Sequence, residues 1–265
     1  KEEARQQKYE FKNFGNLRSP DDFARGIIWN KGNVKKGFLI FNEDQIPKSM
    51  TKLDPKLNNA AVLMNQNILG YCGDKQMNYP ALLAQDLLKK GVTEKDLRDE
   101  IYSQLIKHLS SNSRAESVAK GWQLMCMCVN VFPPTFDMEL YLMHYILAKA
   151  EAGKGAVVEY ARYCVRALEG TISNGDNVAG YVPNEQEILA YKERPPILAN
   201  IFLPDGNCVT ENLPIPPDVD VAKILTLCTG ILDLTDTRID ALGIFVYDMG
   251  PQDEKKDYDM TQVFK

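Results

Sequence analysis

The stretch from Ala115 to Phe132 strongly limits the possible folds, because it is apolar on nearly every side of a helix. A helix with this pattern has to be surrounded by other apolar surfaces, either in a protein core or in a bilayer. Its length of about 18 residues is short for a membrane span, and Lys120 and Gln123 lie inside it. The stretch therefore predicts a core helix, which Pro133-Pro134 ends.

Helical spacing of apolar residues continues on both sides of this segment. Two apolar stripes follow the segment Thr93–Leu109, which indicates burial on more than one side and a central place in a helical bundle. Thr93 is expected to cap that helix, and Gly91 is expected to end the helix before it. Helices are predicted over residues 57–73, 80–91, 93–109, 115–132, 137–149, 156–168 and 185–191.

Residues 1–56 lack such a regular pattern. A short helix is expected within Asp21–Trp29, a turn at Asn30–Asn33, and an apolar run at Phe38–Phe41. We interpret residues 1–56 as an N-terminal arm that its aromatic residues attach to a helical core spanning residues 57–193.

The pattern changes at Arg194-Pro195-Pro196. Strands are predicted at 197–203 and 208–213, joined by a turn at Pro204–Asn207, because Asp-Gly suits the positive φ of a tight hairpin. A helix is expected at 221–228, a strand at Leu242–Tyr247 and a further helix at Tyr258–Phe264. This order is that of a ubiquitin-like roll. The predicted fold class is mainly α: a helical bundle followed, over residues 194–265, by an incomplete α+β roll.

The charge distribution argues against nucleic-acid binding. Residues 191–265 carry 7 lysine and arginine residues against 13 aspartate and glutamate residues, a net charge of −6. Nucleic-acid binding depends on clustered positive charge, which this end lacks. No apolar run reaches the ~20 residues of a membrane span, and residues 1–12 lack a signal-peptide core.

The six cysteines are interpreted as free thiols in a reducing compartment, because no C-x-x-C pair is present and most lie in helical apolar runs. His108 and His144 are the only histidines, so the sequence predicts no metal site and no cofactor. Loops of the G-x-x-x-x-G-K-[ST], G-x-S-x-G and H-E-x-x-H types are absent, and no catalytic residue is predicted.

Several motifs in a fixed order resemble a known family. The run Leu97–Lys107, with the sequence LRDEIYSQLIK, resembles the signature helix of the myosin tail homology 4 domain. The segment Ile68–Asp74 precedes it, Gly121–Cys126 and Phe132-Pro133-Pro134 follow it, and Tyr181–Ile188 is similar to the closing helix of that family. In the family a FERM domain comes next and begins with a ubiquitin-like lobe, as the change at Arg194 suggests.

This resemblance implies a non-catalytic module in the tail of an actin-based unconventional myosin, class VII-like or class X-like. It implies binding of protein cargo or an adaptor peptide and self-regulation through the protein's own motor domain. It also implies a cytoplasmic, cytoskeleton-associated location in actin-rich protrusions or at the cell cortex. The last strand of the ubiquitin-like lobe and the other two FERM lobes are absent from residues 1–265, so we expect a fragment.

Two sets of residues were assigned roles. Exposed cations that would meet an acidic partner form the candidate binding set: Lys89, Lys90, Lys95, Lys107, Arg114 and Lys120. Residues of the family signature are expected to be structural: Arg98, Asp99, Glu100, Gln104, Trp122, Pro133 and Pro134. The junction between the bundle and the roll is a further candidate surface.

Two alternatives remain open. Family members that bind microtubules are similar in having a lysine-rich helix after the Phe-Pro-Pro motif, whereas Met138–Lys149 contains a single lysine. A microtubule-binding tail element of a myosin or kinesin is therefore disfavoured. A Cys–His hydrolase using Cys164 with His108 or His144 is the second alternative, and burial of His108 would argue against it.

Overall fold

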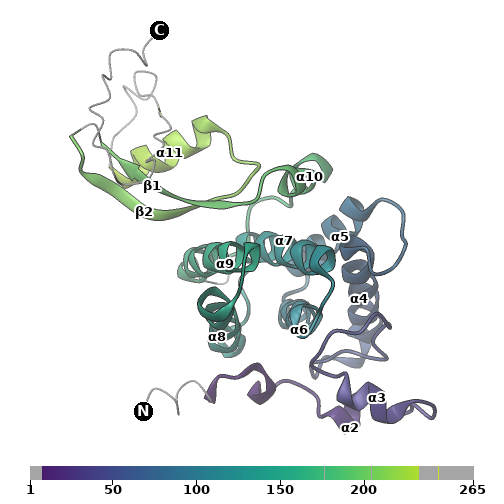
Figure 1. Ribbon diagram of the computed structural model, residues 1–265. Coiled ribbons are helices and arrows are strands. Elements are labelled where there is room, and N and C mark those ends of the chain that lie inside the picture. The colour runs from purple at the N-terminus through teal and green to yellow at the C-terminus, as the bar shows by residue number, and fades with distance from the viewer. Residues whose placement is uncertain (1–7, 176, 204, 233–243, 245–265) are drawn as a thin grey trace. The chain divides into compact units, whose positions relative to one another are not determined.

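The computed structural model describes residues 8–175, 177–203, 205–232 and 244. It divides into two compact units, Lys1–Asp218 and Val219–Lys265. The first unit contains a bundle of α-helices and one β-hairpin (Figure 1). The longer helices are α4 (Asn58–Cys72), α5 (Pro80–Thr93), α6 (Arg98–Leu109), α7 (Ala115–Val131), α8 (Phe136–Ala152), α9 (Ala156–Ser173) and α10 (Glu185–Glu193).

Short helices occupy the N-terminal region and the junctions. They are η1 (Phe11–Asn13), α2 (Pro20–Phe23), α3 (Lys31–Lys36), η2 (Pro55–Leu57) and η3 (Lys95–Leu97). The predicted turn at Asn30–Asn33 is wrong for its last three residues, which lie in helix α3. Asn30 alone makes a turn, with a left-handed φ of 64° at the N-cap of that helix. The Asn33 side-chain amide donates to Asn30 Oδ1 at 2.5 Å, and this bond stabilises the first turn of the helix.

Helix α7 is the core helix that its composition predicts. It contacts α9, α6, α4, α5 and α10, and in Figure 1 it lies between α9 on one side and α4 and α5 on the other. Trp122 is 1% exposed. All twelve residues of α6 are buried, in agreement with the two apolar stripes of its sequence. Within the described residues, no helix has both the length and the hydrophobicity needed to cross a bilayer.

Helix ends follow local chemistry in most places. Pro80 occupies the first turn of α5, and Gly73 ends α4 with a left-handed φ of 83°. Asn184 and Glu187 form a capping box at the start of α10.

The predicted boundary at Gly91 and Thr93 is wrong. Helix α5 continues to Thr93, so Gly91 lies inside it, and the ring of Phe132 occupies the space that a side chain at Gly91 would need. The Thr93 hydroxyl donates to Lys89 O at 3.0 Å within α5, so it does not cap α6.

The predicted hairpin is confirmed as β1 (Ile197–Phe202) paired antiparallel with β2 (Cys208–Ile215). Gly206 supplies a φ of 86° in the turn. Both strands contact α9, so the hairpin belongs to the first compact unit. The predicted domain boundary near residue 193 corresponds to the end of α10, whereas the compact units divide at residues 218 and 219.

In the second unit, α11 (Val221–Ile231) is capped by Asp220, whose carboxylate accepts from Lys223 N at 2.8 Å. Of the predicted strand at Leu242–Tyr247 only Ile244 is described, and the predicted helix at Tyr258–Phe264 lies outside the described residues.

Candidate functional site

The predicted cations lie in three different settings. Lys89 and Lys95 are exposed and Lys90 is half-buried, and all three lie around the end of α5. Arg114 is paired with Glu43 at 2.6 Å, and Lys120 with Glu116 at 2.8 Å. The charge of these two side chains is thus already partly balanced within the chain.

Lys107 corrects one expectation, because it is buried and not exposed. Its ammonium group donates to the carbonyl oxygens of Gly37 and Ile40, each at 2.5 Å. Burial lowers the pKa of Lys107 to about 8. The side chain ties the N-terminal region to α6, and it is not available to an external partner. Sequence spacing placed Lys107 at a helix corner but did not show that residues 37–40 cover it.

The signature residues are all buried, and the polar ones connect α6 to other segments of the chain. Arg98 Nε donates to Gly91 O at 2.9 Å, which links α6 to α5. The Asp99 carboxylate accepts from the backbone N–H of Thr135 at 2.9 Å and from its hydroxyl at 2.6 Å. Thr135 is the N-cap residue of α8 and directly follows Pro133-Pro134, so Asp99 fixes the start of that helix.

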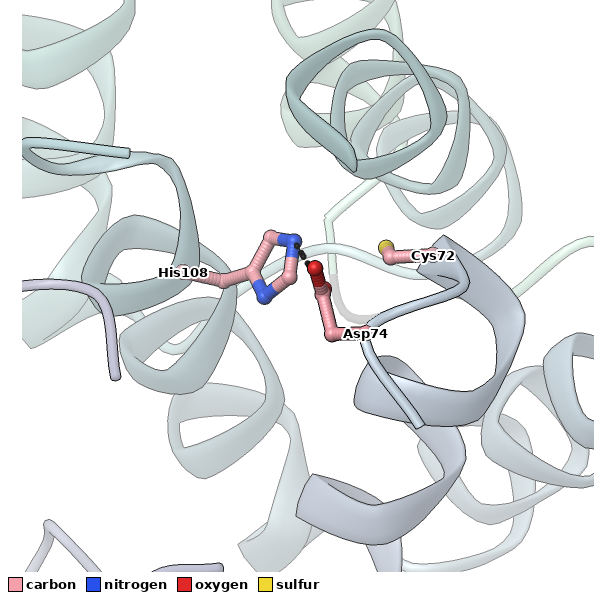
Figure 2. Close-up of side chains that lie close together, drawn as sticks. All are labelled: Cys72, Asp74 and His108. Carbon is pink, nitrogen blue, oxygen red and sulfur yellow. Dashed lines mark ion pairs between the residues drawn. The ribbon is translucent and has the colours of Figure 1, made fainter. Parts of the chain in front are cut away.

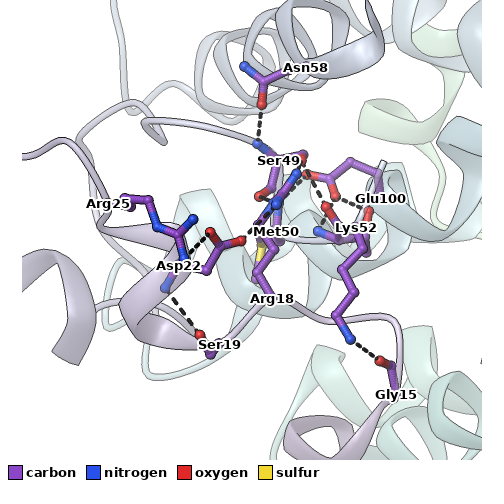
Figure 3. A network of polar contacts seen from close by, with 11 residues as sticks. Gly15, Arg18, Ser19, Asp22, Arg25, Ser49, Met50, Lys52, Asn58 and Glu100 are labelled. Atoms are coloured by element: carbon purple, nitrogen blue, oxygen red, sulfur yellow. Dashed lines mark hydrogen bonds and ion pairs between the residues drawn. The ribbon is translucent and has the colours of Figure 1, made fainter. Parts of the chain in front are cut away.

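The fully buried Glu100 belongs to a network of polar contacts that reaches the N-terminal region (Figure 3). Its carboxylate accepts from Met50 N at 2.8 Å, Thr51 N at 2.7 Å, Thr51 Oγ1 at 2.5 Å and Gln104 Nε2 at 2.7 Å. Arg18 then binds the same segment, with its Nε 3.1 Å from Ser49 O. Glu100 therefore attaches residues 49–51 to α6, and Ser49 in turn accepts a hydrogen bond from Arg18 in the N-terminal region.

A second buried cluster joins Cys72, Asp74 and His108 (Figure 2). One possible ligand atom from each lies within 4.8 Å of the others, as a zinc ion would require. However, the Ser117 hydroxyl donates to Asp74 at 2.9 Å and lies 3.1 Å from His108 Nε2, while Arg114 Nε lies 3.5 Å from Asp74 Oδ1.

The chemistry of these groups favours hydrogen bonding over metal binding. Burial, with a further contribution from Asp74, raises the pKa of the Cys72 thiol well above its usual range, so the thiol keeps its proton in this arrangement. The guanidinium of Arg114 beside Asp74 also opposes a second cation. The donor set thus fits a hydrogen-bonded connection between the end of α4, α6 and α7 better than a metal centre.

The buried imidazole of His108 predicts acid sensitivity. Burial lowers the pKa of His108 from 6.5 to about 4, against the opposite effect of the Asp74 carboxylate. Below pH 6.5 the unfolded chain takes up a proton that the folded protein does not bind until about pH 4, so stability falls as pH falls through this window. We expect urea unfolding to show a loss of about 2 kcal/mol between pH 7 and pH 5 from this group.

The His108→Gln variant is the control for this prediction. It removes the titrating group, so its stability should fall less between pH 7 and pH 5 than that of the unaltered protein. An equal fall in both proteins would show that His108 does not cause the pH dependence.

The structure does not assemble a hydrolase around Cys164. Its thiol is fully buried, and Cys164 Sγ lies 3.5 Å from Cys126 Sγ. Burial raises the pKa of the Cys126 thiol well above its usual range. Among the described residues, no contact of Cys164 with either histidine is found. A buried, thiol-paired cysteine lacks both the base and the access to solvent that a nucleophile needs.

An open cavity of about 390 Å³ lies where α6, α7, α8 and α9 meet, and we call it the Trp122 cavity. Apolar side chains and two lysines surround it. Its lining residues are Leu109, Ser111, Asn112, Val118, Trp122, Ala148, Lys149, Ala152, Gly153, Lys154 and Val157.

Helix α8 also exposes apolar side chains, which we call the α8 stripe: Phe136, Leu140 and Leu147, which are 84%, 53% and 40% exposed. Their spacing of four and seven residues places them on one side of the helix. The same helix contributes Ala148, Lys149 and Ala152 to the Trp122 cavity. The sequence of this helix contains leucine, methionine and tyrosine residues, but its pattern alone does not show which of them face solvent. Exposed apolar residues that form a contiguous surface patch mark interaction sites more often than isolated exposed apolar residues do.

Comparison with known proteins gives this geometry a family context. Residues 84–190 match the family model of the MyTH4 domain. The high molecular weight form of myosin-1 from Acanthamoeba castellanii is 36% identical over 183 residues, which is 69% of this chain and 11% of the relative. The kinesin-like protein KIN-14I from Oryza sativa is 27% identical over 207 residues, covering 74% of this chain and 16% of the relative.

Two solved structures share the fold. The MyTH4-FERM MF1 domain of Dictyostelium discoideum myosin VII, mutant 2, has a TM-score of 0.63 at 22% identity, covering 86% of this chain and 45% of that one. The C-terminal MyTH4-FERM domain of human myosin 7b, solved in complex with the harmonin-a PDZ3 domain, has a TM-score of 0.58 at 23% identity, with 84% and 43% covered. At these identities the likeness establishes the fold alone.

Proposed function

We propose that the chain, whose residues 84–190 match the MyTH4 domain, is a cargo-binding and autoregulatory module in the tail of an actin-based unconventional myosin. Such a module binds proteins and is not catalytic. The Trp122 cavity supports this function, because it offers a place on the helical bundle where a partner could bind. The C-terminal MyTH4-FERM domain of human myosin 7b has the same fold, and its structure was solved in complex with a protein partner, the harmonin-a PDZ3 domain.

The composition of the cavity suggests what it binds. The partly buried Val118 and Val157 and the exposed Ala148 and Ala152 offer apolar surface above the buried Trp122, and Lys149 and Lys154 offer positive charge at the same opening. An apolar side chain of a partner peptide would fill the space, and acidic neighbours would pair with the lysines. We therefore propose an extended or helical peptide with an apolar anchor and flanking Asp or Glu, either from a cargo protein or from the parent motor.

A second candidate surface is the group Lys89, Lys90 and Lys95 at the end of α5, which lies on a different part of the bundle.

We also propose that residues 1–56 act as an arm of the helical domain at 57–193, with the FERM-type lobe in 194–265. Burial of Phe11, Phe14 and Phe38 in one cluster with the bundle helices supports the first part of this division. A location at the cytoskeleton, in protrusions or at the cell cortex, follows from the proposed motor.

Selection of peptides from a randomised display library against the full chain tests the proposal. We expect the selected peptides to carry an apolar anchor flanked by acidic residues. Their affinity should fall by about tenfold or more in Ala152→Trp, which fills the cavity. The matched control is Ala222→Trp, an exposed alanine on α11 outside the cavity, which should keep affinity within about twofold. Equal affinity for both variants would reject the cavity as the binding site.

The kinesin relative supports one alternative, a microtubule-binding tail element. Co-sedimentation of the chain with microtubules at moderate salt, before and after removal of the acidic tubulin tails, separates the two functions. Our proposal predicts no pelleting above the level of a non-binding control protein. Pelleting that is lost in Lys89→Glu/Lys90→Glu would favour the microtubule function instead.

A further inference from the structure

The loop between α2 and α3 carries two large apolar side chains in full contact with solvent. Ile28 and Trp29 are 87% and 86% exposed, the highest values for large apolar residues among the described part of the chain. In Figure 1, α2 and α3 lie side by side at the periphery of the helical bundle. We call residues 26–30 the tip.

The base of this loop is firmly held. Phe23, at the end of α2, is 2% exposed, and its ring lies 4.7 Å from the ring of Phe38, just after α3. Gly26 and Asn30 have left-handed φ values of 90° and 64° on either side of the apolar residues. Two such positions turn the chain sharply, so Ile28 and Trp29 lie on a short turn held at both ends.

Positive charge surrounds the tip. Residues 24–37 contain Arg25, Lys31, Lys35 and Lys36 and no aspartate or glutamate. Lys35 is paired with Asp21, and Arg25 lies 3.4 Å from Asp22, while Lys31 and Lys36 are exposed. The whole chain has a net charge of −5, so this local excess of cations is not a general property of the molecule.

We propose that the tip inserts into the headgroup region of an anionic phospholipid membrane, with the surrounding lysine and arginine side chains at the lipid phosphates. A projecting Ile-Trp pair offers no concave surface for a protein side chain, but it suits the interface, where tryptophan concentrates. Each cation within reach of an anionic surface strengthens binding by about fivefold. Such binding is peripheral and leaves the Trp122 cavity free, so it does not depend on the proposed peptide function.

Flotation of the full chain with vesicles tests this proposal. We expect binding to phosphatidylcholine vesicles that contain phosphatidylserine and little binding to phosphatidylcholine alone. The double variant Ile28→Ser/Trp29→Ser should reduce binding by about tenfold or more, and Lys31→Glu/Lys36→Glu by a similar factor. The matched control is Tyr79→Ser, an aromatic residue that is 71% exposed just before α5 and outside the surfaces described above, which should bind as well as the unaltered chain.

Fluorescence gives an independent measurement on the same proteins. The chain has two tryptophans, and Trp122 is buried, so a blue shift on adding anionic vesicles reports Trp29. Circular dichroism establishes that each variant is folded. Equal flotation of the tip variant and the control, or no blue shift, would overturn the proposal. If the tip variant instead abolishes self-association measured by sedimentation velocity, with vesicle binding unchanged, the tip is an interface between copies and the membrane proposal is wrong.

Discussion

Replacing Glu100 with alanine is expected to lower the free energy of unfolding by about 3–5 kcal/mol, because several buried hydrogen-bond donors lose their acceptor at once. The carboxylate is fully buried and accepts four hydrogen bonds, two of them from the backbone N–H groups of Met50 and Thr51. Its loss leaves these donors without a partner in a site that water does not reach. Urea unfolding at neutral pH measures the change.

Hydrogen exchange identifies the cause of this loss. In the Glu100→Ala variant the amides of Met50 and Thr51 should lose protection, because residues 49–51 no longer bind α6. Glu116→Ala is the control, since that side chain is 82% exposed and pairs only with Lys120 among the described contacts. It should change stability by less than about 0.5 kcal/mol. Unchanged protection at residues 50 and 51 would contradict the role given to Glu100.

Replacing Gly91 with alanine should have the second large effect, a loss of about 2–3 kcal/mol in the free energy of unfolding. A Cβ at this position would lie 2.1 Å from Cε1 of Phe132, with two more ring atoms within 2.6 Å. The ring has little room to move, because it is fully buried against Tyr102, whose hydroxyl donates to Phe132 O at 2.6 Å.

Gly170→Ala is the matched control, measured by the same urea unfolding. Gly170 is also inside a helix, but it is exposed and its added Cβ would meet no atom within 4 Å. That variant should gain up to about 1 kcal/mol from higher helix propensity. Adding Phe132→Leu to Gly91→Ala should restore part of the stability, since the leucine side chain vacates ring positions. A Gly91→Ala variant as stable as Gly170→Ala would show that the close approach to Phe132 is not present in solution.

The spacing of apolar residues is sufficient to predict where the helices lie, but it does not predict every helix boundary. Apolar spacing predicted the core helix at Ala115–Phe132 and the burial of Arg98–Leu109 on several sides. The Asp-Gly turn predicted the β-hairpin. Gly91 was misread because a glycine near a helix end favours a C-cap locally, while its actual role depends on Phe132, 41 residues later in the chain. Such a contact has no signal in the local pattern.

The candidate sites were less predictable than the fold. Lys107 was grouped with exposed cations because helix position alone does not reveal that the N-terminal region covers it. The Trp122 cavity depends on how the ends of α6, α8 and α9 meet over α7, and its two lysines are separated from Trp122 by more than twenty residues. The cluster of Cys72, Asp74 and His108 likewise forms only when α4 and α6 are packed together.

Binding of an acidic, apolar-anchored peptide in the Trp122 cavity can be measured in one titration. The dissociation constant of a library-selected peptide is measured for the unaltered chain, for Lys149→Glu/Lys154→Glu at the cavity, and for Lys89→Glu/Lys90→Glu at the end of α5. We expect binding to weaken by about tenfold or more in the cavity variant and by less than about twofold in the other. The reverse order would move the binding site to the end of α5, and unchanged binding in both variants would contradict the account.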